Sequence, residues 1–265
     1  MLAKSNSDKH QFIIRDLSHF LRSLGISDTI IALEDNLRLS EEQILKIEMF
    51  FSSYLDGLPL DYILNESVFY GNKFYVDSRV LIPRPETELI IDWVFESHFS
   101  NHSLIAELGT GSGCISISLA IKNPNFKIIA SDISSIALEV ANFNLRSHNV
   151  KNILLAQSNW MSCIKSQSLD LIISNPPYLK PNDPHLKDLK HEPSIALTAK
   201  NGLQSFHEIA AQAILSLKLG GRIIFEHGYS QANEVSSILE DNGFKNIMSR
   251  QDLKGLDRFT YAEKL

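Results

Sequence analysis

The feature of this chain that most constrains its fold is a glycine-rich turn between a short apolar strand and an apolar helix. Residues 104–108 (Leu-Ile-Ala-Glu-Leu) run directly into Gly109-Thr110-Gly111-Ser112-Gly113, and an apolar helix is expected over residues 115–122. Because glycine has no Cβ atom, such a turn can be tight and can approach a bound molecule closely. A strand, glycine turn and helix in this order are typical of open α/β sheets that bind nucleotide-like ligands. The alternative is a turn that serves only the packing of the helix on the strand.

The chain after residue 83 continues to alternate between strand and helix patterns. Further strands are expected at residues 127–131, 153–156, 169–174 and 222–226, with short terminal strands at 244–248 and 259–262. Further helices are expected at residues 136–146, 203–217 and 231–241. This alternation predicts an α/β fold with a doubly wound, Rossmann-like, mostly parallel sheet, although it does not give the order of the strands.

A small helical domain is expected ahead of this sheet. Between residues 5 and 54 apolar side chains recur every three to four positions, which predicts several short amphipathic helices. Ser40 followed by two glutamates is typical of a helix start. Two β-prone runs, residues 68–70 and 74–76, flank Gly71-Asn72 and predict a hairpin. The expected organisation is a helical domain over residues 1–60, a β-hairpin linker over 61–82 and the sheet domain over 83–265.

Charge and composition narrow the classes of partner. The formal net charge of −6 argues against a partner bound mainly through its phosphates, because that mode of binding needs a basic surface. The two cysteines, Cys114 and Cys163, stand alone in the sequence, so we expect no disulfide and no metal site and interpret both as small core residues. The polar start and the lack of a long apolar run favour a cytoplasmic protein without a membrane partner.

Two residues near the ends of the next strands are candidate ligand contacts. Asp132 ends the second strand, where an acid in this type of fold accepts hydrogen bonds from ribose hydroxyls. It could instead cap the following helix, a role that Ser134 could also fill. Trp160 follows the third strand, where an indole could stack on adenine, although a lone tryptophan is often a core residue.

The tetrapeptide Asn175-Pro176-Pro177-Tyr178 begins where the apolar strand 169–174 ends. Its two prolines make the segment stiff and remove amide donors while leaving carbonyl acceptors. A planar NH2 group has two N–H donors, and the Asn175 side-chain oxygen and the Pro176 carbonyl can accept from them. The Tyr178 ring can pack against such a group. The segment therefore predicts a site for an amide or exocyclic amine nitrogen, with a rigid loop start as the alternative interpretation.

The glycine turn resembles the first motif of S-adenosylmethionine-dependent methyltransferases more than the dinucleotide pattern Gly-x-Gly-x-x-Gly. It has glycines at every second position and an acid, Glu107, two residues ahead of the first glycine. That cofactor is positively charged and has no phosphate, so a carboxylate close to the turn is compatible with it. The two motifs together predict methyl transfer from S-adenosylmethionine to nitrogen, with Asn175, Pro176 and Tyr178 as the catalytic residues.

Over about its whole length the chain resembles the PrmC (HemK-type) release-factor glutamine methyltransferases. The resemblance is carried by residues 81–88 (Leu-Ile-Pro-Arg-Pro-Glu-Thr-Glu), 107–113, 174–178 and 192–197. Segment 81–88 discriminates most, because the glycine turn and the tetrapeptide also occur together in nucleic-acid adenine methyltransferases. The resemblance implies a class I methyltransferase fold and N5-methylation of the glutamine in the Gly-Gly-Gln motif of class I peptide chain release factors.

The resemblance also implies roles for individual residues. For the cofactor, the matching positions are Glu107, Gly109, Thr110, Gly111, Ser112, Gly113, Asp132, Trp160 and Asn175. For the substrate amide, they are Asn175, Pro176, Pro177 and Tyr178. The helical domain is expected to help dock the release factor, and the enzyme is expected to be a monomer that does not bind nucleic acid directly. Arg84, Glu86 and Glu88 either shape the site or belong to a rigid linker that starts a helix.

The chain departs from the family pattern at Glu107 and at Asn159, where the family often has aspartate. These departures bear on cofactor affinity more than on the type of reaction. Two other functions share part of the pattern. An N6-adenine methyltransferase acting on DNA or RNA would use the same tetrapeptide, and a cofactor-binding protein without catalysis would need only the glycine turn. A hydride-transferring dehydrogenase would leave Asn175 to Tyr178 without a role.

Overall fold

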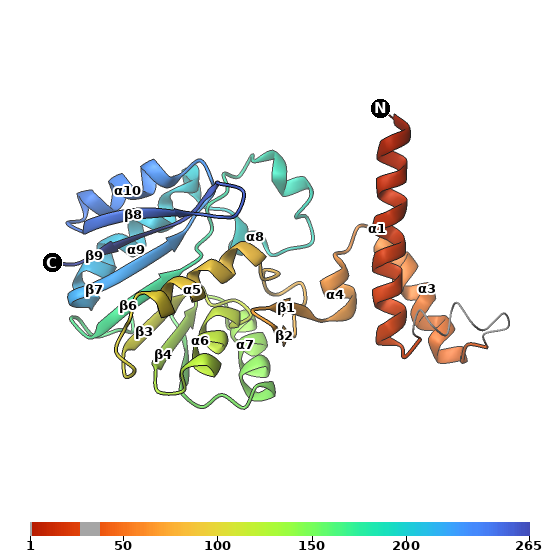
Figure 1. The fold of residues 1–265 in the computed structure, drawn as a ribbon, viewed down its shortest axis with the longest axis horizontal. Coiled ribbons are helices and arrows are strands. Elements are labelled where there is room, and N and C mark those ends of the chain that lie inside the picture. Colours follow the sequence, from red (N-terminus) through yellow and green to blue (C-terminus); the bar gives the residue numbers. More distant parts are fainter. Residues whose placement is uncertain (1, 27–37) are drawn as a thin grey trace. The chain divides into compact units, whose positions relative to one another are not determined.

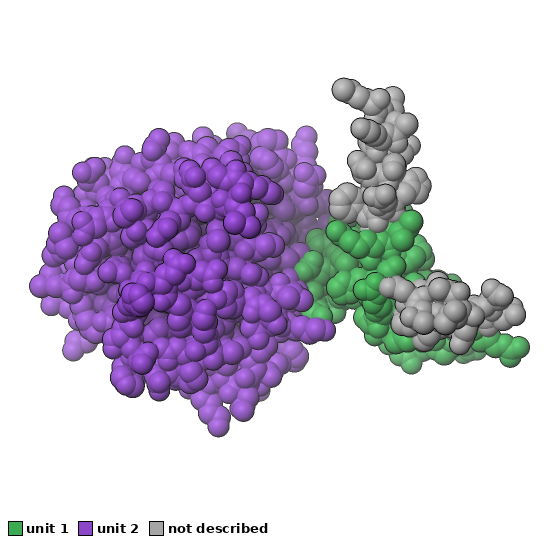
Figure 2. Space-filling model, viewed as in Figure 1, with its two compact units in different colours: residues 1–66 green, residues 67–265 purple. Residues whose placement is uncertain are grey.

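The computed structural model describes residues 2–26 and 38–265. The chain divides into two compact units, Met1–Glu66 and Ser67–Leu265, which Figure 2 colours separately. Residues 27–37, which fall within the helical domain expected from the sequence, lie outside the described residues. No helix in the described ranges is both long and apolar enough to cross a membrane.

The first unit is helical, with α1 (Leu2–Ser23), α3 (Glu41–Leu55) and α4 (Leu60–Leu64). Ser40 caps α3 as expected: its hydroxyl accepts from the Gln43 amide, and the Gln43 side chain accepts from the Ser40 amide. The rings of Phe20 on α1 and Phe50 on α3 stack with their centroids 4.5 Å apart. The expectation of several short helices was wrong for α1, which runs for 22 residues because no glycine or proline interrupts it before Gly25.

The second unit begins with the expected hairpin, formed by β1 (Ser67–Phe69) and β2 (Asn72–Phe74). Phe69 pairs with Asn72, so the turn residues are Tyr70 and Gly71 rather than Gly71 and Asn72. Both have positive φ, 50° and 73°. A two-residue turn of this kind needs positive φ at both positions, and it matches the twist of the strands.

A seven-stranded sheet forms the centre of the second unit, in the order β5-β4-β3-β6-β7-β9-β8. The strands are β3 (Leu104–Leu108), β4 (Lys127–Asp132), β5 (Ile153–Gln157), β6 (Leu169–Ser174), β7 (Leu217–Glu226), β8 (Lys245–Gln251) and β9 (Asp257–Glu263). Strands β3 to β7 pair in parallel, whereas β9 is antiparallel to both of its neighbours. The expected doubly wound α/β sheet is therefore confirmed.

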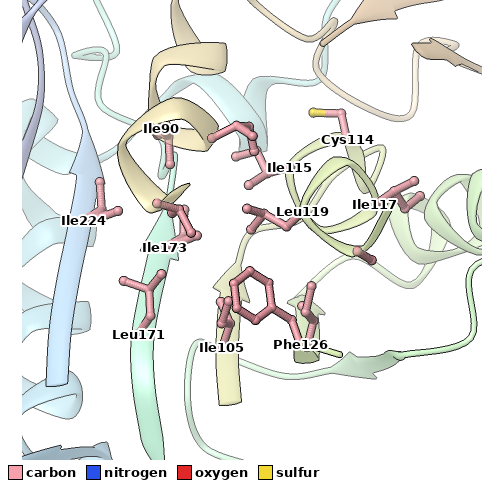
Figure 3. Packing of buried hydrophobic residues seen from close by; sticks show 14 of the residues in the cluster. Ile90, Ile105, Cys114, Ile115, Ile117, Leu119, Phe126, Leu171, Ile173 and Ile224 are labelled. Atoms are coloured by element: carbon pink, nitrogen blue, oxygen red, sulfur yellow. The ribbon is translucent and has the colours of Figure 1, made fainter. Parts of the chain in front are cut away.

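Helices cover both faces of this sheet (Figure 1). The longer ones are α5 (Glu88–Glu96), α6 (Cys114–Lys122), α7 (Ser135–Ser147), α9 (Gln204–Ser216) and α10 (Ala232–Asp241). One core lies between the sheet and α5 and α6, where Ile90, Leu119 and Ile173 converge (Figure 3). The other core lies under α9 and α10. Alternate residues of a strand enter opposite cores, Ile105 the first and Ala106 the second.

Shorter elements join these parts of the second unit. They are α8 (Ser194–Leu197) and the 3-10 helices η1 (Pro85–Thr87), η2 (Pro184–Lys187) and η3 (Lys200–Gly202). Helix η1 leads directly into α5, so the acids Glu86 and Glu88 lie at a helix start, as the linker interpretation expected.

The two cysteines lie in different environments. Cys114 is buried at the start of α6 and belongs to the core drawn in Figure 3, as expected. Cys163 is exposed, so its interpretation as a core residue was wrong. It lies in the connection from β5 to β6, where Met161 and Ile164 occupy the core positions and leave Cys163 on the outer side.

Candidate active site

Strand register brings four chain segments to one edge of the sheet. Leu108 pairs with Ser131 on one side and Ser174 on the other, and Ser174 pairs with Phe225. The residues that follow these strand ends therefore meet at the carboxyl edge, where open α/β sheets bind ligands. They include the glycine turn, Asp132, Asn175 and Glu226. The first and last of these are more than a hundred positions apart in the sequence.

A cavity opens at this edge, and many of the residues expected from the sequence line it. Among the expected residues, the lining ones are Gly109, Gly111, Asp132, Trp160, Asn175 and Pro177. Asn159, which the sequence analysis linked to cofactor affinity, also lines it, as do Leu81, Pro193, Ile195 and Ala196 from the segments that carry the family resemblance. The other lining residues were not expected from the sequence: Arg79, Val80, Ile133, Ser134, Ala137 and Ser158. The remaining candidates lie around the cavity without lining it: Glu107, Thr110, Ser112, Gly113, Pro176 and Tyr178.

The glycine turn is fixed by backbone hydrogen bonds to the end of β4. The Thr110 amide donates to the Ser131 carbonyl at 2.9 Å. Gly109 and Gly111 have φ of 71° and 55°, values that residues with a side chain rarely adopt. Both glycines line the cavity. Gly113, with φ of 81°, faces α7 instead: a Cβ there would lie 3.4 Å from the Cβ of Ala141. The turn thus shapes the cavity with its first two glycines and packs the helices with its third.

Glu107 is buried behind the turn, with 2% of its surface exposed. Its Oε2 accepts from the Thr110 hydroxyl at 2.7 Å, from the Ser116 amide at 3.1 Å and from the Ser116 hydroxyl. Burial raises the pKa of this carboxyl to about 7, and the hydrogen bonds from Ser116 and Thr110 oppose the rise. In this position Glu107 ties the turn to the first turns of α6.

Asp132 links the glycine turn to the start of α7. Its Oδ2 accepts from the Gly111 amide at 3.0 Å and its Oδ1 accepts from the Ser134 amide at 2.9 Å. Burial raises the pKa of Asp132, while these backbone hydrogen bonds favour the ionised form. The N-cap of α7 is Ser134, whose hydroxyl accepts from the Ala137 amide. Asp132 is therefore not the helix cap, and its carboxylate keeps lone pairs that face the cavity.

Trp160 lies on the cavity wall and has an unusual backbone conformation. Its φ is 51°, in the left-handed region that bulky residues rarely occupy. The indole Nε1–H donates to Glu208 Oε2 at 2.8 Å, and the Gln204 side chain donates to Glu208 Oε1 at 2.7 Å. Helix α9 thus fixes the orientation of this ring, an arrangement that the sequence pattern did not predict.

The tetrapeptide 175–178 leaves the sheet with free acceptors. The Ser174 hydroxyl donates to the Leu108 carbonyl at 2.8 Å and fixes the start of the segment. Within residues 2–26 and 38–265, no protein group hydrogen-bonds the Asn175 side chain or the Pro176 carbonyl. The Tyr178 ring packs against the core under α9 and α10, and burial raises the pKa of its phenol.

The segment 81–88 is joined to Glu192, although about a hundred residues separate them in the sequence. Glu192 is buried, and its two carboxylate oxygens accept from the Ile82 amide at 3.1 Å and from the Arg84 guanidinium at 2.5 Å. The neighbouring residues Leu81 and Pro193 both line the cavity. Two of the segments that carry the family resemblance therefore form one wall of the site.

The cavity suits a nucleoside cofactor that has no phosphate. Among its lining residues the one cation is Arg79, and its guanidinium is already paired with Asp77 at 2.7 Å and Glu139 at 2.9 Å. Asp132 supplies a carboxylate acceptor for hydroxyl groups, and Trp160 supplies an aromatic surface. The glycines leave room for close approach of the ligand to the backbone.

Several solved structures share this fold. A methyltransferase of Pyrococcus furiosus superposes with a TM-score of 0.56 at 15% identity, covering 83% of this chain and 98% of the other. A ribosomal protein L11 methylase from Lactobacillus delbrueckii superposes with a TM-score of 0.54 at 18% identity, covering 72% of this chain and 84% of the other. Residues 85–205 match the family model of the methyltransferase small domain. Fold and site together define a class I methyltransferase whose cofactor is S-adenosylmethionine.

Curated relatives identify the family within this class. The release factor glutamine methyltransferase of Coxiella burnetii is 35% identical over 230 residues, 86% of this chain and 83% of its own length. That of Neisseria gonorrhoeae is 39% identical over 79% of this chain and 78% of its own length. The chain belongs to the release factor glutamine methyltransferase family. It is also 40% identical to the bifunctional methyltransferase of Rickettsia bellii, of which it spans 46%.

Proposed function

We propose that this chain transfers a methyl group from S-adenosylmethionine to the side-chain amide nitrogen, N5, of the glutamine in the Gly-Gly-Gln motif of class I peptide chain release factors. We place this reaction in the cytoplasm and assign it to a monomer that acts on protein, without direct contact to nucleic acid. The relatives named as release factor glutamine methyltransferases support the substrate class. The helical unit, Met1–Glu66, is the proposed docking element for the release factor.

The observation that carries this proposal is a pair of neighbouring acceptors that have no partner among the described residues: the Asn175 side-chain oxygen, at the cavity, and the Pro176 carbonyl, next to it. A glutamine amide is a weak nucleophile because its nitrogen lone pair is delocalised into the carbonyl. Its two N–H groups need acceptors, and Asn175 Oδ1 and the Pro176 carbonyl are free to accept from them. Held in this way, the nitrogen can direct its lone pair toward the cofactor cavity that Asn175 also lines.

Catalysis would then rest mainly on orientation. Bound S-adenosylmethionine would supply the electrophilic methyl group and the thioether leaving group. Holding two reactants in line can supply roughly 7–11 kcal/mol of the barrier. The amide nitrogen becomes acidic as it gains the methyl group. One of its protons can then pass along its hydrogen bond, toward Asn175 Oδ1 or the Pro176 carbonyl oxygen, and on to water. No strong general base is required, and the buried Glu107 is assigned a structural role.

Gly109, Gly111, Asp132 and Trp160 are the residues that we assign to the cofactor. Asp132 would accept hydrogen bonds from the ribose hydroxyls, and Trp160 would stack on the adenine. Thr110, Ser112 and Gly113 are assigned to the shape of the turn rather than to direct contact, because they do not line the cavity. Asn159 does line it and carries no charge, unlike the aspartate that is frequent in the family.

The proposal is tested by transfer of a labelled methyl group from S-adenosylmethionine to recombinant release factors. Label is expected on a release factor with the Gly-Gly-Gln motif and not on its variant with Gln replaced by Ala. A parallel reaction with DNA and RNA tests the adenine alternative, for which methylated adenine would appear in nuclease digests. Failure with several release factors, or label on nucleic acid, would contradict the proposal.

A further inference from the structure

The turn from β7 to α10 wraps around the end of the tetrapeptide 175–178. Gln231, the residue before α10, is half-buried, and its side-chain amide joins three separate chain segments. Its Nε2 donates to the Tyr178 carbonyl at 3.2 Å and to the Gly202 carbonyl at 3.0 Å. Its Oε1 accepts from the Gly228 amide at 2.9 Å. Only one orientation of the amide satisfies all three partners, because Nε2 faces two carbonyls and Oε1 faces an N–H.

The space around this connection is closely filled. Gly202 has φ of 71°, and a Cβ at this position would lie 2.8 Å from the Tyr178 carbonyl oxygen. A Cβ at Gly228 would lie 2.9 Å from Gln231 Oε1 and 3.8 Å from Cδ2 of the Tyr178 ring. A side chain at Gly202 would therefore clash with the Tyr178 carbonyl, and one at Gly228 would clash with Gln231, which bonds to both glycines.

The tetrapeptide is consequently fixed at both ends and free in between. Ser174 anchors its start on β3, as described above. After Tyr178, the Leu179 amide donates to the Leu197 carbonyl at 2.9 Å, and the Ala199 amide donates to the Leu179 carbonyl at 3.0 Å. Between these anchors, the acceptors of Asn175 and Pro176 have no protein partner within the described residues.

We propose that Gln231 is a positioning residue for methyl transfer, which acts through Tyr178 to fix the orientation of the Asn175 and Pro176 acceptors at the cavity. The prolines restrict φ at two successive positions, so a displacement of the Tyr178 carbonyl is passed along the segment rather than absorbed. A misplacement of about 1 Å can cost about 100-fold in rate. This inference rests on the proposed function, because the acceptors matter only if an amide nitrogen is the substrate.

The decisive variant is Gln231→Glu, which keeps the size of the side chain and the acceptor for Gly228 but loses both donors. At pH 8 the new carboxylate would face the Tyr178 and Gly202 carbonyls, so kcat for release factor methylation is expected to fall roughly 10- to 100-fold. As the pH falls through the pKa of the new carboxyl, the protonated group regains one O–H donor. The ratio of variant to wild-type kcat should then rise, which a general loss of structure would not produce.

The matched control is Gln167→Glu, which makes the same change in charge at an exposed side chain just before β6, at the opposite end of that strand from the site. It should keep wild-type kcat at every pH. Affinity for S-adenosylhomocysteine, measured by calorimetry, should stay within about twofold of wild type in both variants, because the Gly109 and Asp132 side of the cavity is untouched.

A second readout does not depend on catalysis. Hydrogen exchange at the Ala199 amide, which donates to the Leu179 carbonyl, should be faster in Gln231→Glu than in wild type. The neutral variant Gln231→Leu loses the same two donated bonds and also the acceptor for the Gly228 amide, adds no charge, and should show faster exchange as well. Wild-type kcat at pH 8 in Gln231→Glu, or an equal loss of cofactor affinity, would overturn the inference. If the wild-type enzyme itself does not methylate release factors, the proposed function fails. Unchanged hydrogen exchange at Ala199 in both Gln231 variants would instead refute only the anchoring of the tetrapeptide by Gln231.

Discussion

The two halves of the active site are held in different ways. The cofactor half, defined as residues 107–113 with Asp132 and Trp160, is fixed largely by neighbours: the bonds from Thr110 to Ser131 and from Gly111 to Asp132 join the ends of adjacent strands. The acceptor half, defined as residues 175–178, depends on contacts from distant segments. Gln231, for example, donates to the Tyr178 carbonyl and to the Gly202 carbonyl beside it. Under the proposed function, cofactor binding depends mainly on the ends of adjacent strands, with Trp160 held from α9, whereas the orientation of the substrate amide depends on more distant segments.

The largest effect is expected from a change in the acceptor half. Asn175→Ala removes one of the two free acceptors, and kcat should fall by roughly 10²–10³, by analogy with the loss of one preorganised hydrogen-bonding group in other enzymes. Affinity for S-adenosylhomocysteine should change by about twofold or less. Single-turnover kinetics and calorimetry on the same preparation measure the two effects. Equal losses in both would show that the halves are not separable.

The next effect belongs to the cofactor half. Asp132→Ala removes acceptors for two charge-assisted hydrogen bonds, each worth roughly 1.5–3 kcal/mol, and also frees the Gly111 amide. The dissociation constant for S-adenosylhomocysteine should rise at least about 100-fold, while kcat at saturating cofactor changes much less. The dissociation constant of Asp132→Asn should lie between those of wild type and Asp132→Ala, since asparagine keeps one oxygen acceptor. Unchanged affinity in Asp132→Ala would remove this residue from the cofactor site.

A pH experiment sharpens the comparison on the acceptor side, where Glu226 is buried beside Tyr178. Its Oε2 has no hydrogen-bond partner within the described part of the chain, and burial raises the pKa of its carboxyl to about 7. Between the ordinary pKa of 4.5 and about 7 the folded protein binds more protons than the unfolded chain, so the free energy of unfolding falls as pH rises.

The variant Glu226→Gln removes this dependence. Each pKa unit corresponds to about 1.4 kcal/mol, so its stability relative to wild type should increase by up to about 3 kcal/mol from pH 4.5 to pH 8. Urea denaturation across this range provides the measurement. Glu107, whose pKa burial also raises to about 7, remains in both proteins and cancels in the difference. A difference that stays constant with pH would contradict the raised pKa of Glu226.

The smallest effect is expected at Glu208, which holds the Trp160 indole from α9. Glu208→Ala leaves the ring without its hydrogen bond, an interaction worth about 1.5–3 kcal/mol when one partner is charged. Because Glu208 is exposed, a hydrogen bond from the indole to water replaces part of this free energy, and cofactor affinity should fall only about three- to tenfold. Trp160 fluorescence, followed with Trp93 replaced by Phe, should show a more mobile ring. Glu208→Gln retains an acceptor and should stay close to wild type.

The same contrast explains how much the sequence could predict. The glycine turn, the strand 169–174 and the positions of Gly109, Asp132, Trp160 and Asn175 follow from local patterns, and the structure brings these four to one cavity. The order of the strands and the two-sided core were not predictable, because period and propensity describe a segment and not its neighbours.

Residues that act over long sequence distances had no local signal. Gln231 is one polar residue ahead of an amphipathic helix, and Glu208 is a single acid on an exposed position of α9. Their roles depend on which backbone group the fold brings within hydrogen-bonding distance. The exposed Cys163 shows the same limit in the opposite direction, since a lone cysteine in sequence does not reveal whether its loop position points inward.

The most direct test of the account is to locate the methyl group on the product. A class I release factor is incubated with S-adenosylmethionine and either the wild-type enzyme or Asn175→Ala, and its peptides are fragmented in a mass spectrometer. Wild type is expected to add the mass of one methyl group to the side chain of the glutamine in Gly-Gly-Gln, and Asn175→Ala is expected to add almost none in the same time. A methyl group on any other residue, or equal methylation by both enzymes, would contradict this expectation.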